Sequence, residues 1–241
     1  MQITKMLVPE SKYNIKCPHE MTPEFIVIHN TANDASAMAE ISYMIGNNNK
    51  VSFHCAIDNT RIVQGVPFNR NTWNAGDGGN GNGNRKGISL EICYSKSGGD
   101  DFEEAEKLAA EYTAYLLKQY DWGIDKVKKH QDFANKYCPH RTLDLGWQRF
   151  LNMVSSYLED KPINDEKIES GSDEQVKTYQ NGSTTEVVYA DTACTKRIGS
   201  LDPRERCDCF GIFNDRAMVR YNVNGTNNYK IGFCKWLGGV K

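Results

Sequence analysis

Short apolar runs alternate with longer amphipathic stretches in the first part of the chain. A short apolar run, typical of a buried strand, occurs at residues 25–28, and residues 53–57, 62–66 and 87–92 are also predicted to be strands. Apolar residues at helical spacing occur at residues 35–46, 102–120 and 145–158. The segment 76–87 is rich in glycine and asparagine, so we expect a loop there. This alternation predicts an α/β fold in which helices cover a central sheet.

The stretch 159–180 has a different composition. It lacks apolar periodicity and holds seven acidic residues against three lysines, together with Pro162 and the pair Gly171-Ser172. Such a composition is typical of an extended, solvated linker. It therefore predicts a first domain at 1–158, a linker at 159–180 and a second domain at 181–241.

The segment 181–241 is predicted to be all β. Asparagine and glycine residues separate short β-type runs at 187–189, 196–201, 207–213, 218–222 and 229–236. Five short strands in this length favour a small barrel. Nine basic residues against six acidic ones make the segment mildly cationic, and we find no motif for chemistry in it.

Composition narrows the class of protein. The hydrophobic share of 39% and the charged share of 25% are ordinary for a soluble globular protein. No run of 18 apolar residues occurs, so we expect no membrane insertion. The net charge of −2 gives no general attraction to nucleic acid. The N-terminal residues lack the apolar core of a secretory signal, and the eight cysteines are widely spread, so we expect cytoplasmic synthesis with reduced thiols.

Two histidines and one cysteine stand out as candidates for chemistry. His29 directly follows the apolar run 25–28, where a strand leaves the sheet and can present a side chain to a cleft. His130 and Cys138 lie eight residues apart in HQDFANKYCPH. Two imidazoles and one thiolate, with a position left for water, form a ligand set that catalytic zinc accepts. The spacing alone is equally compatible with packing or surface histidines and a buried thiol.

Five motifs follow one another in the first domain: IVIHNTAN at 26–33, FHCAIDN at 53–59, TWNAG at 72–76, ISLEI at 88–92 and HQDFANKYCPH at 130–140. Together they resemble the N-acetylmuramoyl-L-alanine amidases of the type-2, peptidoglycan-recognition-protein-like family, in particular the endolysins of phages of Gram-positive bacteria. The resemblance covers about residues 1–158. It implies a central mixed sheet flanked by helices, one zinc ion, and hydrolysis of the amide between muramic acid and L-alanine in peptidoglycan.

The resemblance also implies a role for individual residues. The zinc ligands fall on His29, His130 and Cys138, and the general base or acid falls on Glu91. An assisting lysine falls on Lys136, where it could stabilise an oxyanion on the substrate carbonyl. Without the resemblance, a strand glutamate and a loop lysine would be read as solvated side chains.

Two positions depart from the family pattern. Phe53 stands where some relatives have a tyrosine, so a mechanism that needs that hydroxyl is excluded and more weight falls on the glutamate. Asn74 stands where a histidine is frequent, which leaves a substrate contact possible but weaker in charge. His54 and Trp73 are candidates for lining the substrate cleft, although a plain strand position beside Cys55 is the favoured interpretation of His54.

Two further histidines lie near the motifs. His140, two residues after Cys138, is a candidate to replace or support a metal ligand. His19 is expected at the surface.

The C-terminal segment is similar to the SH3-type wall-binding modules of clostridial endolysins. This similarity implies an SH3-like barrel that binds a cell-wall polymer. The pair Cys207 and Cys209 is poorly spaced for a single zinc ion, which favours strand thiols. A missing secretory signal favours a phage lysin that is made in the host cytoplasm and reaches the wall through a membrane hole made by another protein, over a host autolysin.

Two alternatives belong to other classes. A Cys–His peptidase or amidase with Cys17 or Cys55 as nucleophile would be indifferent to chelators and sensitive to alkylation. A recognition protein of the same family would keep the cleft and lose a metal ligand, whereas all three ligands are present in this sequence.

Overall fold

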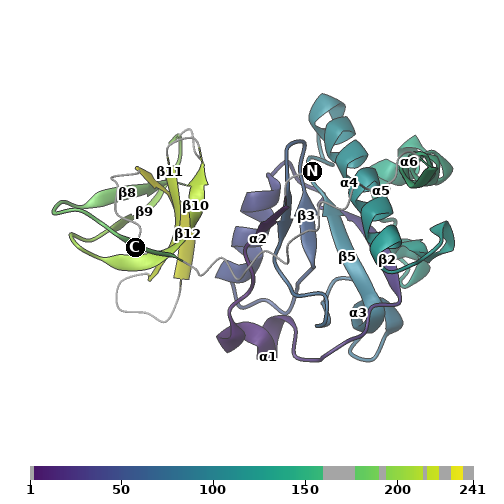
Figure 1. Ribbon diagram of the computed structural model, residues 1–241, viewed down its shortest axis with the longest axis horizontal. Helices are drawn as coiled ribbons and strands as arrows, with labels where there is room; N and C mark the ends of the chain where they lie inside the picture. Colours follow the sequence, from purple (N-terminus) through teal and green to yellow (C-terminus); the bar gives the residue numbers. More distant parts are fainter. Residues whose placement is uncertain (1–2, 160–176, 190–193, 214–215, 223–228, 236–241) are drawn as a thin grey trace. The chain divides into compact units, whose positions relative to one another are not determined.

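The chain folds into two compact units, Met1–Pro162 and Ile163–Lys241. The computed structural model describes residues 3–159, 177–189, 194–213, 216–222 and 229–235 (Figure 1). The division falls inside the acidic stretch, most of which lies outside the described residues. Residues 177–180, which the composition assigns to the linker, form a strand, so the linker prediction extends too far.

The first unit is built on a six-stranded mixed sheet. Its spatial order is β1 (Ile3–Lys5), β4 (Ile62–Gln64), β3 (Cys55–Ile57), β5 (Gly87–Ile92), β2 (Phe25–Asn30) and β6 (Val127–Lys129). The β3–β4 pair is antiparallel, and all other neighbouring strands are parallel. The predicted α/β fold with a mixed sheet is confirmed.

The central strands β2 and β5 are apolar because both of their faces are covered. Ile26, Val27 and Ile28 in β2 are fully buried, and so are Ile88 and Leu90 in β5. Figure 1 shows the sheet between α2 on one side and α4 with α6 on the other. Parallel strands covered in this way present continuous apolar runs, which is the pattern seen in the sequence.

Three helices form the covering layers, namely α2 (Ala37–Gly46), α4 (Gly99–Gln119) and α6 (Trp147–Glu159). The Ser36 hydroxyl caps α2 by accepting a hydrogen bond from the amide of Ala39. Glu106 of α4 pairs with Arg149 of α6, which joins the two helices on one face of the sheet. Shorter helical segments are η1 (Glu10–Lys12), α1 (Tyr13–Lys16), α3 (Asn82–Lys86), η2 (Ile124–Lys126), η3 (His130–Asp132) and α5 (His140–Leu145).

Two details of the helix prediction are wrong. The segment predicted as a loop contains α3, because the Asp77 carboxylate accepts hydrogen bonds from the amides of Gly83 and Asn84 and so caps the helix. The helix predicted over 145–158 begins only at Trp147. Gly146 has a φ of +108° and separates it from α5.

The second unit is an antiparallel sheet of six described strands. Their order is β7 (Lys177–Gln180), β10 (Arg206–Phe213), β11 (Arg216–Asn222), β12 (Tyr229–Lys235), β8 (Glu186–Tyr189) and β9 (Arg197–Leu201). The all-β prediction is confirmed. Among the described residues no pairing joins β7 to β9, so a closed barrel is not seen there.

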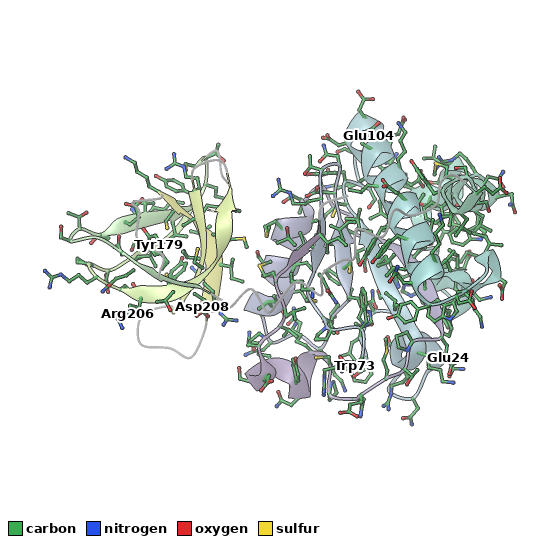
Figure 2. The ribbon with its side chains drawn as sticks, viewed as in Figure 1. Glu24, Trp73, Glu104, Tyr179, Arg206 and Asp208 are labelled. Carbon is green, nitrogen blue, oxygen red and sulfur yellow. The ribbon has the colours of Figure 1, made fainter. Side chains whose placement is uncertain are left out.

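Aromatic and aliphatic side chains fill the interior of this sheet. Tyr179, labelled in Figure 2, is fully buried and packs with Val188, Leu201 and Val219. Cys207 and Cys209 are buried in the same cluster. This is the environment of strand thiols, as the spacing suggested.

In the described part of the chain, no helix is both long and apolar enough to cross a lipid bilayer.

Candidate active site and metal centre

Three neighbouring parallel strands end side by side and bring the candidate residues together. His29 of β2 is in register with Glu91 of β5. On the other side of β2, Ile28 is in register with Lys129, the last residue of β6, and His130 follows directly. Side chains that follow the carboxyl ends of adjacent parallel strands share one edge of the sheet, where α/β proteins place their sites.

The candidate metal ligands form a compact, buried cluster. One ligand atom from each of His29, His130 and Cys138 lies within 4.8 Å of the others. The Nδ1 atoms of the two histidines face each other at 3.0 Å. This is the one such group of histidine, cysteine and acidic side chains found among the described residues. Two nitrogens and one sulfur converging on one point fit zinc well.

Burial sets the protonation of these ligands. It lowers the pKa of His130 to about 4 and that of His29 well below its usual value, so both rings are neutral at neutral pH. Burial also raises the pKa of the Cys138 thiol to about 11. A cation that binds here must therefore displace the thiol proton.

The loop that carries the thiol is held by its own backbone. The amide of Gln131 donates to the carbonyl of Cys138 at 3.0 Å, which brings the loop back beside His130. Backbone groups of Asn30 and His140 hydrogen-bond to the thiol and lower its pKa against the larger effect of burial. The Cys138–Pro139 peptide bond is cis.

Glu91 lies beside the cluster, and its side chain is 12% exposed. Its Oε1 atom is 3.9 Å from Nδ1 of His29 and accepts a hydrogen bond from Asn74 at 3.0 Å. Its Oε2 atom is buried and has no hydrogen-bond partner within the described residues. Burial raises the pKa of Glu91 to about 7. A carboxyl group with this pKa can both accept and return a proton near neutral pH.

Lys136 is exposed on the loop between His130 and Cys138. After the larger effect of burial, its positive charge lowers the pKa of both histidines and of Glu91. The ammonium group is therefore within electrostatic reach of the whole cluster.

This geometry agrees with the comparisons with known proteins. The family model described as N-acetylmuramoyl-L-alanine amidase matches residues 19–141. The chain belongs to this family.

Two similar proteins come from Bacillus subtilis. The N-acetylmuramoyl-L-alanine amidase XlyB is 57% identical over 157 residues, which are 65% of this chain and 50% of XlyB. The amidase CwlA is 49% identical over 191 residues, 79% of this chain and 70% of CwlA. This chain thus spans half the length of XlyB. A solution structure of the PlyG catalytic domain is 50% identical with a TM-score of 0.63, and it covers 67% of this chain and 99% of that domain.

Trp73 lines a pocket next to the cluster. The pocket has a volume of about 330 Å³ and is also lined by Lys50 and Gly76. The Lys50 ammonium lies 4.7 Å from the centre of the indole ring. Gly76 has a φ of +75°, and a Cβ atom there would lie 3.2 Å from Nε2 of His130. The pocket therefore opens beside a candidate metal ligand, and a glycine permits this close approach.

His54 does not line this pocket, and its placement corrects that expectation. The side chain is fully buried. Its Nδ1 atom accepts from the amide of Ser89 at 2.9 Å, and its Nε2 atom lies 2.9 Å from the carbonyl of Arg70. These two partners select the neutral ring with its proton on Nε2. His54 thus joins β5 to the loop after β4.

Two asparagines support the site. The sequence did not predict a structural role for either of them. Asn74 donates to Ser89 as well as to Glu91, so it holds the carboxylate where a substrate contact was expected. The Asn30 side chain accepts from the amides of Arg141 and Thr142 and fixes the segment after the thiol to the end of β2. The position of Asn30 directly after a candidate ligand was the only signal in the sequence.

The remaining histidines stay outside the cluster. The ring of His140 lies 3.1 Å from the carbonyl of Ser95 and supports that loop. The backbone of His140 hydrogen-bonds to the Cys138 thiol. His19 is exposed, as expected, and its ring meets the edge of Trp73.

His54 makes the stability of the first unit depend on pH. Burial lowers its pKa to about 4, whereas in the unfolded chain it is about 6.5. The stability it contributes is full above about pH 6.5 and is lost as the pH falls towards 4. Replacing His54→Asn should lower the slope of unfolding free energy against pH in this window by up to about 1.4 kcal/mol per pH unit.

Urea unfolding at several pH values, with a chelator present, measures this slope. His19→Asn is the comparison variant. Burial and nearby cations lower the pKa of His19 as well, but His19 is exposed, so its change in slope should be smaller than that of His54→Asn. A slope that does not change in His54→Asn would contradict the assignment.

Proposed function

We propose that this chain hydrolyses the amide between N-acetylmuramoyl residues and L-alanine in bacterial peptidoglycan, using zinc held by His29, His130 and Cys138. The observation that carries the proposal is the convergence of these three ligands and Glu91 at the ends of three adjacent parallel strands. Membership of the amidase family supports the choice of bond.

The side chains around the cluster suit this reaction. Zinc bound there would polarise the scissile carbonyl and make a bound water more acidic. Glu91 takes the proton of the attacking water and returns it to the departing amine of L-alanine. Asn74 holds one oxygen of this carboxylate and leaves Oε2 for the water. Lys136 supplies positive charge where the carbonyl oxygen becomes negative.

The pocket beside His130 offers a place for the substrate. Trp73 gives an aromatic face and Lys50 a positive charge, which suit a sugar ring and a carboxylate of the stem peptide respectively. We infer that the muropeptide lies along this pocket, with its lactyl amide at the metal ligands.

The second unit is proposed to attach the enzyme to the wall. It is a separate compact unit, and its segment 181–241 carries nine basic residues against six acidic ones. No metal-binding group was found among its described residues. An SH3-like fold and a clostridial phage origin stay predictions, as does release of the protein to the wall through a membrane hole.

A cysteine nucleophile has little support. Burial raises the pKa of Cys55 to about 12 and also raises that of Cys17. Both thiols are buried, and both ring nitrogens of the adjacent His54 have backbone partners. A reactive thiolate needs an exposed setting, which neither residue has. The Arg70 guanidinium beside Cys17 lowers the pKa of that thiol, but burial has the larger effect.

The zinc proposal predicts about one zinc ion per purified chain. Cys138→Ser should lower metal affinity and wall lysis together, because it replaces a thiolate ligand by a weak hydroxyl. Metal analysis and lysis assays on the same preparations measure both. Cys194→Ser, in the second unit, is the control and should change neither. A metal-free preparation with full lytic activity would overturn the proposal.

The proton-transfer role predicts that Glu91→Gln lowers turnover by ~10²–10⁴-fold while zinc content stays unchanged. The substitution keeps the size of the side chain and removes the proton acceptor. Steady-state rates on soluble muropeptide, with zinc measured in the same sample, test it. Glu103→Gln, on the exposed side of α4, is the matched control. Near-normal turnover in zinc-loaded Glu91→Gln would show that another group takes the proton.

The division of labour predicts that a chain ending at Glu159 folds, binds zinc and cleaves soluble muropeptide at close to the full rate. On intact cells it should be slower, because attachment raises the effective concentration of the active site at the wall. The solved catalytic domain of PlyG shows that a similar unit is stable alone. Equal lysis of intact cells by the short and full chains would argue against a wall-binding second unit.

A further inference from the structure

A pocket lies in the second unit, and none of the candidate metal ligands lines it. It has a volume of about 530 Å³. It is lined by the end of β7, by the turn that follows it at residues 181–183, and by two arginines, Arg204 and Arg206. Figure 2 labels Arg206 on the second unit, and both arginine side chains are exposed.

The floor of the pocket is held by a buried side chain. Asn181 is 3% exposed. Its amide donates to the carbonyls of Thr184 and Asp202 at 2.8 Å, and its Oδ1 accepts from the amide of Gly182 at 2.8 Å. The amide of Arg204 donates to the carbonyl of Gly182 at 2.8 Å. Two turns are thus joined into one rigid frame, so the pocket is formed before any ligand arrives.

The backbone at Arg204 is held in an unusual conformation. Its φ is +60°, a left-handed conformation that suits glycine or asparagine better than arginine. It lies in the turn closed by the hydrogen bond from the amide of Glu205 to the carbonyl of Asp202. Positions of this kind are found at binding sites as well as in turns.

The two arginines are available for a ligand. In the part of the second unit that the structure describes, no ion pair involves Arg204 or Arg206, whereas Arg220 is paired with Asp208. The carboxylate between them, that of Glu205, accepts from the amide of Asp202 in its own turn. Two unpaired guanidinium groups on one pocket wall form a site for anions.

The rest of the lining is polar and uncharged. Thr178 and Ser183 offer hydroxyl groups, and Gln180 offers an amide whose nitrogen donates to the carbonyl of Arg204. Such groups recognise the hydroxyls of a sugar or polyol. A ligand that carries both negative charges and hydroxyl groups can therefore use both kinds of lining side chain.

We propose that this pocket binds a polyol-phosphate polymer attached to the cell wall, with successive phosphates on Arg204 and Arg206. The proposal rests on the wall-binding role of the second unit. Arginine binds phosphate through paired hydrogen bonds, and the repeating charge of the polymer lets both arginines act at once. The hydroxyls between the phosphates meet Thr178 and Ser183.

Sedimentation with purified walls tests the proposal on the full chain. All proteins carry Glu91→Gln, so that the walls stay intact. The double change Arg204→Gln with Arg206→Gln should weaken wall binding at least about tenfold, since two charge-assisted contacts are lost. The matched control is Lys196→Gln with Arg197→Gln, two exposed cations on or next to β9 that do not line the pocket. It should bind within about twofold of the parent.

Two further arms make the outcome specific. Walls from which hydrofluoric acid has removed phosphodiester polymers should bind the parent as weakly as intact walls bind the double variant. Arg204→Lys with Arg206→Lys keeps the charge without the paired geometry and should recover part of the binding. Partial recovery in the lysine variant, with an unchanged thermal unfolding midpoint in both double variants, shows that the ligand contact and not the fold was lost.

Several results would overturn the inference. Unchanged binding of the glutamine double variant would show that the pocket is not the site. Equal binding of the parent to stripped and intact walls would assign the pocket to a glycan or a peptide carboxylate instead. If the parent binds intact walls no better than a chain ending at Glu159, the wall-binding role itself fails, which is a different result from either of these.

Discussion

The parallel pairing of β2 with β5 and β6 is the constraint on which the active site depends. It sets His29 opposite Glu91 and places His130 directly after the end of β6. A slip of one residue would turn each side chain to the other face of the sheet. Because both faces of these strands are buried, the apolar pattern alone would not oppose such a slip. Specific hydrogen bonds oppose it: the amide of Ser89 in β5 donates to Nδ1 of His54, and the hydroxyl of Ser89 accepts from Asn74. A slip would break both.

Burial of the site shifts the pKa values of its side chains and reduces the stability of the fold. Burial keeps the histidines neutral and raises the pKa of Glu91 to about 7, which suits proton transfer. It also leaves Nε2 of His29 and Oε2 of Glu91 without a partner within the described residues. Buried polar atoms without a hydrogen bond are unfavourable for folding. This cost is of the kind that proteins accept at sites that bind a ligand or a metal.

In the proposed function the first unit carries out the reaction, and the second unit attaches the enzyme to the wall. The first unit holds the ligands on strands, which fix them better than free loops would. The second unit offers a preformed pocket with two unpaired arginines and no metal-binding cluster within its described residues. If the proposed substrate, an insoluble wall polymer, is correct, attachment through the second unit would raise the local concentration of the enzyme without any change to the active site.

Periodicity and composition predicted the features of this protein that depend on residues close together in the sequence. Strands β2 to β5, strands β8 to β12 and the long helices follow from periodicity, composition indicates two segments, and the ordered motifs point to His29, His130, Cys138 and Glu91. Strands β1 and β6 were not predicted, because three residues each are too few to show a pattern. The other features depend on partners distant in sequence. Strand β7 exists because Tyr179 is in register with Cys207, and His54 is buried because Arg70 and Ser89 satisfy its ring. Contacts of this kind leave no periodic trace, because hydrogen bonds and packing between separated segments are decided only when the chain has folded.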